Sequence, residues 1–318
     1  MMAVAIILIG SGSMPDQAVA QQGYPAKAVR VVVPFPAGGT TDLVARTVQA
    51  KFAEGLGRPV LIENRGGAGG SIGAAEVARA TPDGHTLLMV FDTHAVNHHL
   101  YMQAPDPFTA LEHITLMCTS PSILVARTGF APRTLVDLVD YAKAHPARVT
   151  YGSAGSGSSP HLGVLLLERA ALISMIQVPY KGGGPLVQAL LGNQIDVGFL
   201  PAPIVLSHIK SGKLTPVASG ARKRIPQLVD VPTVSETFAG FEQTTWFGLL
   251  APAGTPKDVI ARVHRDMTSA LADREVRERL AEVGFEVVAS SPEEFLRFVR
   301  AESDKLGKLI RDHKIVVE

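Results

Sequence analysis

The chain has 318 residues, with 30 Lys and Arg against 29 Asp and Glu, so its formal net charge is +1. This length is enough for two domains of ordinary size, and the balanced charge removes any electrostatic argument for nucleic acid or an anionic membrane as a partner. A single cysteine, Cys118, excludes an internal disulfide and a metal site built from several cysteines. We interpret Cys118 as a small buried hydrophobic residue.

The N-terminus has the pattern of a secretory signal. An apolar run, Ala3 to Gly10, precedes polar residues and then Ala18-Val19-Ala20, which is typical of a cleavage site. The run is too short to span a bilayer. We therefore predict a signal peptide over residues 1–20 and a periplasmic mature protein. The basic residues that usually precede the apolar run are missing, so a structural N-terminal segment stays open as an alternative.

Beyond residue 24, short apolar runs alternate with helical patterns, which predicts an α/β fold with mostly parallel strands. The first helix shows an apolar face at Val44, Val48, Phe52 and Leu56. The predicted strands are Val29–Phe35, Val60–Asn64, Thr86–Phe91, Ile114–Met117, Ile123–Ala126, Val149–Ser153, Ile173–Tyr180, Val197–Leu200, Leu214–Ser219 and Trp246–Leu250. The other predicted helices are Ile72–Ala80, Leu135–His145, Pro160–Ala171, Gly184–Gly192, Ile204–Lys210 and most of the last stretch after Pro256.

The last helices most simply cover the sheet that the N-terminal strands begin. The chain then leaves the first domain near Ile114–Val125 and returns near Leu214–Leu250. We predict domain 1 as residues 24–118 plus 221–318 and domain 2 as residues 119–220. Two crossings make a hinge with a cleft between the domains, and ligands of open α/β sheets bind beyond the carboxyl ends of the strands.

The first strand ends in a glycine-rich loop, Pro36-Ala37-Gly38-Gly39-Thr40-Thr41-Asp42, which leads into a helix. Gly38 and Gly39 permit close approach of the backbone to a ligand, and the helix end offers unpaired N–H groups to an anion. Asp42 either complements the helix dipole or organises the loop from behind. A plain strand–helix connection with a glycine turn stays open.

A second loop of the same kind, Ala154-Gly155-Ser156-Gly157-Ser158-Ser159, follows the strand Val149–Ser153. Its serines add hydroxyl donors to the backbone N–H groups. His161, in the following turn, either reaches the cleft or has a structural role. If the two loops face each other, they form a clamp that holds an anion from opposite sides.

Motifs for catalysis and cofactors are missing. The serines of the second loop lack a G-x-S-x-G frame, and neither common nucleotide-binding pattern occurs. His94, His98 and His99 have a spacing compatible with a metal, but there is no H-E-x-x-H. Lys181, before three glycines, is compatible with imine formation, but we favour the interpretation that it caps a solvent-facing turn. We expect no metal, no cofactor and no catalysis.

Several motifs, in this order and spacing, give the chain a family resemblance from about Tyr24 to its C-terminus. Together they resemble the Bordetella uptake gene (Bug, or TctC-like) family, the extracytoplasmic substrate-binding proteins of tripartite tricarboxylate transporters. The motifs are Tyr24-Pro25, Val32-Val33-Pro34-Phe35-Pro36-Ala37-Gly38-Gly39, Val60-Leu61-Ile62-Glu63-Asn64-Arg65, Pro82-Asp83-Gly84-His85-Thr86-Leu87-Leu88, Thr93-His94-Ala95-Val96-Asn97, Val178-Pro179-Tyr180-Lys181-Gly182, Asp230-Val231-Pro232-Thr233 and Trp246-Phe247-Gly248-Leu249.

The resemblance implies a two-domain periplasmic-binding-protein (Venus flytrap) fold, type II-like, with two hinge crossings. It implies a monomeric receptor that captures a small organic carboxylate between its domains and delivers it to membrane subunits of a transporter. The ligand-binding residues that it implies, together with the wall described next, are Phe35, Ala37, Gly38, Gly39, Asp42, Thr93, His94, Ser153, Gly155, Ser156, Ser158, His161, Leu200 and Pro201.

Two departures from the family pattern bear on the ligand. Leu200-Pro201 stands where members often carry Asp-Asn, and Asp92 stands where many have a small residue. Phe199, Leu200 and Pro201 are expected to form an apolar wall, because they offer no partner to an ammonium group. This wall favours an aliphatic or aromatic mono- or dicarboxylate over an amino acid, unless Asp92 replaces the missing acid.

Two other classes of function stay open at this point. A ligand-sensing protein that acts on a signalling receptor would need the same cleft and the same ligand. A cleft enzyme, such as a hydrolase or lyase, would need a nucleophile and base that the sequence does not reveal.

Overall fold

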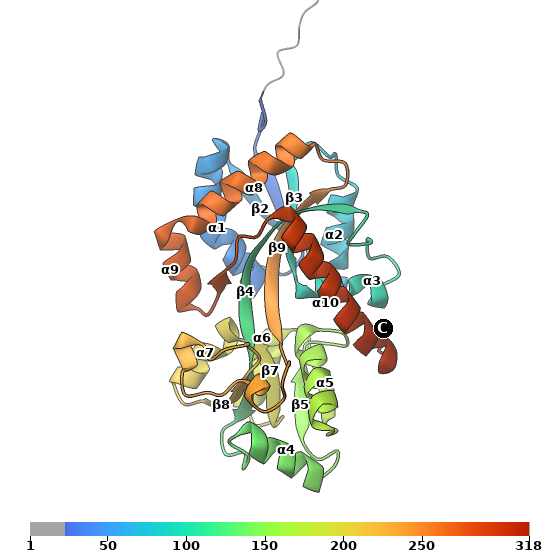
Figure 1. Cartoon of the computed structure of the whole chain (residues 1–318), viewed down its shortest axis with the longest axis vertical. Helices are drawn as coiled ribbons and strands as arrows, with labels where there is room; N and C mark the ends of the chain where they lie inside the picture. The colour runs from blue at the N-terminus through green and yellow to red at the C-terminus, as the bar shows by residue number, and fades with distance from the viewer. Residues whose placement is uncertain (1–22, 318) are drawn as a thin grey trace, which may run out of the picture.

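The computed structural model describes residues 23–317, so the predicted signal peptide lies outside the described residues. Two α/β lobes are joined by two long central strands (Figure 1). These strands, β4 (Leu111–Arg127) and β9 (Thr244–Pro252), pair antiparallel with each other. Across residues 23–317, no helix combines the length and apolar character that crossing a bilayer requires.

Within the described residues the strands lie in the order β2-β1-β3-β9-β4-β7-β5-β6, and β8 and β10 also pair with β4. β1 is parallel to β2 and β3, and β5 is parallel to β6 and β7. Parallel neighbours need crossover connections, which the helices supply. The other strands are β1 (Val29–Val33), β2 (Val60–Asn64), β3 (Thr86–Phe91), β5 (Thr150–Ser153), β6 (Ile176–Pro179), β7 (Val197–Pro201), β8 (Leu214–Ser219) and β10 (Glu286–Val287).

The helices cover both faces of each lobe's sheet. We call lobe 1 the part built from β1–β3, α1–α3, α8–α10 and β10, and lobe 2 the part built from β5–β8 and α4–α7; β4 and β9 connect them. The helices are α1 (Thr40–Leu56), α2 (Ser71–Ala78), α3 (Asn97–Leu100), α4 (Leu135–Ala144), α5 (Ser159–Ala171), α6 (Gly183–Leu191), α7 (Ala202–Lys210), α8 (Lys257–Ala272), α9 (Arg274–Glu282) and α10 (Pro292–Asp312), with short 3₁₀ turns η1 (Ala68–Gly70), η2 (Asp92–Ala95), η3 (Pro226–Leu228) and η4 (Val234–Glu236).

The packing bears on the boundary at residue 221, within the predicted return at Leu214–Leu250. Val234 and Phe241 are buried in the same cluster as Phe199 and Leu124, which is the core of lobe 2. Trp246, by contrast, is fully buried in a lobe 1 cluster. A boundary at residue 221 is therefore too early, since apolar side chains on both sides of it belong to one core. We propose that the second crossing lies near the start of β9, while the first, near residue 118, stays a prediction.

The sequence predicts two strands where the structure has one. β4 runs without a break through Pro121 and changes partners there, from β9 to β7. Near Pro121 the sequence does not read as one continuous strand, and this is where the strand passes from one lobe to the other. Because β4 is one continuous strand, it links the two lobes through its backbone and through its hydrogen bonds to β9 and β7.

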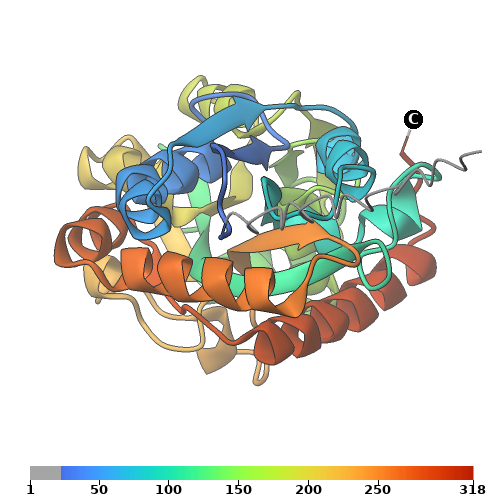
Figure 2. The same cartoon turned by 90° about the horizontal axis from the view of Figure 1, so that it is seen from above.

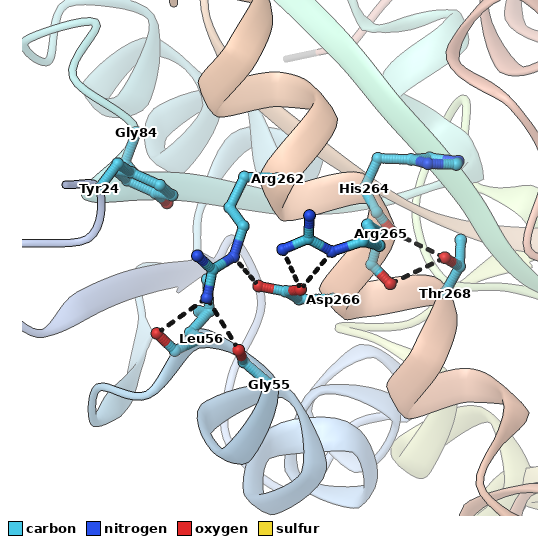
Figure 3. Close-up of polar contacts among 9 residues, drawn as sticks. All are labelled: Tyr24, Gly55, Leu56, Gly84, Arg262, His264, Arg265, Asp266 and Thr268. Atoms are coloured by element: carbon cyan, nitrogen blue, oxygen red, sulfur yellow. Dashed lines mark hydrogen bonds and ion pairs between the residues drawn. The ribbon is translucent and has the colours of Figure 1, made fainter.

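In lobe 1, α8 packs against the C-terminal end of α1 through a polar cluster (Figure 3). The Arg262 guanidinium donates to the carbonyl of Gly55 at 3.0 Å and also pairs with the Asp266 carboxylate. Arg265 contacts the other oxygen of Asp266 at 3.2 Å. A cation at the end of a helix satisfies carbonyls that have no partner within it and complements its dipole.

α10 connects the two lobes on one side of the hinge. Figure 2 shows that α8 and α10 lie on the same side of the molecule. Leu306 and Leu309 of α10 form one buried cluster with Leu162 and Leu165 of α5, and with Val96 after η2. This cluster joins residues of both lobes, so it limits the direction in which the lobes can move apart.

Candidate functional site

The first loop is held from behind by Asp42. Its carboxylate, only 3% exposed, accepts hydrogen bonds from the Gly38 N–H at 2.9 Å, from Arg46 Nε at 2.9 Å and from Asn64 Nδ2 at 3.0 Å. Burial opposes ionisation, but hydrogen bonds from Arg46, Gly38 and Asn64 outweigh it and lower the pKa of Asp42. Of the two roles left open by the sequence, the structure supports organisation of the loop.

This geometry changes the role predicted for Asp42 and Gly38. Asp42 faces inward, so it positions the loop and does not present its carboxylate to a ligand. The N–H of Gly38 is used by Asp42 and is not free for an anion. The donors that remain are the N–H groups of the first turn of α1, whose N-cap residue, Gly39, provides no side-chain cap.

Phe35 and Ala37 complete this side of the site. Phe35 is half-buried and packs edge-to-face on Phe91, with ring centroids 5.6 Å apart. Its ring lies against Gly70, where an added Cβ would lie 3.1 Å from it. Ala37 is exposed at the tip of the loop. An aromatic wall beside exposed backbone suits a ligand with an apolar portion.

The side chains of the second loop are used within lobe 2. The Ser158 hydroxyl accepts from Ala154 N at 3.1 Å and donates to the Gly155 carbonyl at 2.7 Å. Ser153 Oγ is buried and accepts from Gln177 Nε2 at 2.8 Å. Ser158 therefore shapes the loop with both its donor and its acceptor, whereas Ser153 is used as an acceptor and is fully buried.

His161 also belongs to this internal network. Its Nδ1 accepts a hydrogen bond from the N–H of Gly157 at 3.0 Å. Burial, followed by the nearby His313, lowers the pKa of His161 to about 4. The structural role left open by the sequence is the one observed, and Gly155 and Ser156 remain as the accessible part of the loop.

Each of the two loops leads into a helix whose N-terminus has no side-chain cap. α5 begins at Ser159, and the N-cap Ser158 makes no side-chain cap, just as Gly39 makes none for α1. α4, α9 and α10 have side-chain caps, at Thr134, Asp273 and Ser291, whereas α2, α3, α6, α7 and α8 lack one, as α1 and α5 do. The first N–H groups of α1, and those of Ser159 and His161 in α5, are therefore left for a ligand or solvent, whereas Pro160 has no N–H to offer.

The lobes approach each other beside the second loop. Gly157 lies against Leu100 at the end of α3, with no room for a Cβ. η1 is bonded to η2 and to α3. The Gly69 carbonyl accepts from Thr93 Oγ1 at 2.9 Å and from Asn97 Nδ2 at 3.0 Å. Thr93 thus lies beside the interlobe region with its hydroxyl bonded to the Gly69 carbonyl, and its contact with a ligand stays a prediction.

His94 does not line the cleft. It is 5% exposed, and its nearest charged or titratable neighbours are His113 and His98. Burial, then these two histidines, lowers its pKa to about 3. The side chain points into lobe 1 because η2 turns successive residues to different sides. In residues 23–317, no three His, Cys, Asp or Glu side chains form a group suited to a metal ion.

The predicted apolar wall at residues 199–201 is also corrected. Leu200 is fully buried with Ile123 in one cluster, whereas Phe199 is buried with Leu124 in another. Consecutive residues of a strand point to opposite faces of the sheet, and helices cover both faces here. Pro201 is likewise buried, paired with Ser122 in β7. Neither Leu200 nor Phe199 is available to a ligand.

Asp92 emerges as the polar group between the lobes. It is 5% exposed, and its Oδ1 has no hydrogen-bond partner among the described residues. It borders a cavity of about 10 Å³, shared with Ser159 of α5 and with Gln243, which precedes β9. Burial raises the pKa of Asp92 to about 8; Ser159 and Lys305 oppose this rise and Glu302 adds to it. Burial therefore favours the protonated form of Asp92, next to a space for about one water molecule.

Comparison with known proteins gives a consistent result. A family model described as "Tripartite tricarboxylate transporter family receptor" matches residues 44–315. A protein from the ttuE-ttuC' intergenic region of Agrobacterium vitis is 36% identical over 311 residues, which cover 96% of this chain and 90% of that protein.

Solved structures agree in fold over almost the whole chain. The periplasmic binding protein BugD is 35% identical with a TM-score of 0.82, covering 92% of this chain and 99% of its own. MatC from Rhodopseudomonas palustris, solved with bound malate, is 34% identical with a TM-score of 0.81, covering 90% and 100%. A second R. palustris protein, solved with adipate, is 30% identical with a TM-score of 0.84, covering 92% and 99%. The predicted two-domain periplasmic-binding-protein fold is confirmed, and the chain belongs to the tripartite tricarboxylate transporter receptor family.

Proposed function

We propose that this protein is a periplasmic receptor that captures a small organic carboxylate between its two lobes and delivers it to the membrane subunits of a tripartite tricarboxylate transporter. The uncapped N-termini of α1 and α5, one in each lobe, are the observation that carries the proposal. Each directs unpaired N–H groups and a positive helix end at an anion. Relatives of this fold hold malate and adipate, which are both carboxylates.

The internal bonds of the second loop argue against a hydrolase. Ser158 donates to the Gly155 carbonyl, and His161 Nδ1 accepts from the Gly157 N–H. A nucleophilic serine needs its hydroxyl hydrogen-bonded to the base, and here each group is bonded to the backbone instead. We therefore propose binding without catalysis.

Since residues 199–201 do not form an apolar wall of the cleft, the preference among ligands needs another basis. Because Leu200 is buried, the preference against amino acids no longer rests on it. It rests on Asp92, whose burial favours the protonated form, and this form pairs poorly with an ammonium group. The cavity beside Asp92 has room for about one water molecule, through which Asp92 would reach a bound carboxylate. We propose dicarboxylates such as malate or adipate as the first candidates.

A thermal-shift screen over mono-, di- and tricarboxylates, their aromatic analogues, aspartate and glutamate tests this function. A true ligand at about one hundred times its dissociation constant adds about 2.7 kcal/mol of apparent stability. The ligand should be recovered unchanged after incubation with the protein. No stabilisation by any carboxylate, or conversion of the bound compound, would contradict the proposal.

A further inference from the structure

One groove among the described residues 23–317 lies outside the space between the two loops. It is a groove of about 620 Å³ along the outer side of α5, bounded by β5, β6 and the segment after α10. No residue of the first loop lines it. Its volume is in the range of small-molecule sites. The lining residues are Tyr151, Ser156, His161, Leu165, Glu168, Arg169, Leu172, Ile173, Ser174, Met175, Gln177, His313, Ile315 and Val316.

His161 presents a hydrogen-bond donor to this groove. Its Nδ1 accepts from Gly157 N, so the neutral ring carries its proton on Nε2. Nε2 makes no hydrogen bond to the described residues and is not among their buried unpartnered polar atoms, so it is open to the groove. The donor is therefore accessible to a ligand or to water.

Tyr151 supplies a second donor beside it. The residue is 2% exposed, its ring stacks on His161 with centroids 6.3 Å apart, and its hydroxyl bonds to no described residue. Both residues line the same groove, so we assign this pair of donors to one carboxylate. At the rim, Arg169 is only loosely paired, with 3.7 Å to Asp312 and a side chain 53% exposed.

The remaining lining is apolar. Leu165 and Ile315 form part of the cluster between α5 and α10, and Met175 is buried at the floor. Leu172 and Val316 are 86% and 77% exposed at the edge of the groove. Burial of these side chains against the apolar part of a ligand would stabilise the complex through the hydrophobic effect. Glu168 also lines the groove near Tyr151; its carboxylate accepts from the Met175 N–H, and burial raises its pKa, which reduces the repulsion of a bound carboxylate.

We propose that this groove is a second ligand site, which binds an amphipathic organic acid: a carboxylate held by His161 Nε2, the Tyr151 hydroxyl and Arg169, with an aliphatic body against Leu165, Met175 and Ile315. The site is separate from the interlobe cleft but is linked to it through one side chain. A ligand that fixes His161 on the groove side also fixes its bond to Gly157, and hence the second loop of the cleft.

Octanoate is a suitable probe, because it joins one carboxylate to an apolar chain. Calorimetry with the purified protein should detect octanoate binding, which Tyr151→Phe and Arg169→Ala each weaken at least about threefold. Matched controls on the same lobe, Tyr141→Phe and Arg133→Ala, should leave it unchanged. Hydrogen exchange should show that octanoate slows exchange at the Gly157 amide, since His161 accepts from it.

Gly38→Val separates this proposal from that of the cleft. The variant should lose binding of the cleft ligand but keep octanoate binding. The second site is overturned if octanoate does not bind, if Gly38→Val abolishes its binding, or if Tyr151→Phe and Arg169→Ala bind it as tightly as the controls do.

Discussion

The buried carboxylate of Asp42 accepts a hydrogen bond from the N–H of Gly38, four residues earlier, at 2.9 Å. This bond closes the turn between β1 and α1. Arg46 and Asn64 bind the same carboxylate, so the loop, the helix and the neighbouring strand β2 are fixed together. The exposed backbone of the loop is therefore held in a defined position before any ligand arrives.

Asp42→Ala should loosen the first loop and weaken carboxylate binding at least about tenfold, or 1.4 kcal/mol. The side chain does not touch the ligand in our account, so the loss comes from the ordering of the loop on binding. Calorimetry with the best ligand measures it. Asp140→Ala, an exposed aspartate on α4, is the control; equal affinities in the two variants would show that Asp42 does not position the site.

Gly38→Val should reduce affinity at least about tenfold while the protein stays folded. Gly38 has φ +81°, which a β-branched residue adopts only with strain, although there is space for its Cβ. Gly129 has φ +79° and equally open space, far from the site. Gly129→Val carries the same backbone cost, so unchanged affinity in Gly38→Val, or equal losses in both, would remove the first loop from the site.

The pH dependence of stability should differ between the protein and Asp92→Asn. The pKa of Asp92 is raised to about 8 in the folded protein, so folding favours its protonated form. The stabilisation is fully present below the unfolded pKa near 4 and is lost as pH rises toward 8, at a slope of at most about 1.4 kcal/mol per pH unit.

Urea unfolding at intervals from pH 4 to 8 measures this difference. His94, His113 and His161, whose pKa values are lowered by burial, act in the opposite direction but are present in both proteins. The parent protein should therefore lose stability relative to Asp92→Asn as pH rises. Parallel curves would mean that Asp92 is ionised in the folded state.

Asp266→Ala should destabilise the protein by roughly 2 kcal/mol, because it removes a buried carboxylate hydrogen-bonded to charged groups. Its partners, Arg262 and Arg265, are then left without a counter-ion, and α8 loses a contact with the end of α1 (Figure 3). Ligand affinity should not change. Glu282→Ala on α9, an exposed residue, is the control for loss of a surface charge.

The strands were predictable where local pattern decides them. Val60–Asn64, Thr86–Phe91 and Leu214–Ser219 have the predicted bounds, since each is a short apolar or alternating run between turn residues. The two glycine loops follow from the same reasoning. The continuity of β4 could not be predicted in this way, because Pro121 interrupts the apolar pattern of the sequence where the strand passes between the lobes.

Side-chain direction was harder to predict than element bounds. Leu200 and His94 were placed at the cleft from their positions after strands, but both point into a core. Which face of a strand or turn is solvent-exposed depends on helices that pack later in the chain. Asp92 was identified only as a departure from the family pattern, and its burial between the lobes required the positions of α5 and β9.

The central claim is that one carboxylate is held by both lobes. A crystal structure of the protein with malate or adipate tests it most directly. We predict a carboxylate within hydrogen-bond reach, directly or through one water molecule, of backbone N–H groups at the starts of both α1 and α5. A ligand that contacts only one lobe, or that lies away from both helix ends, would contradict the account.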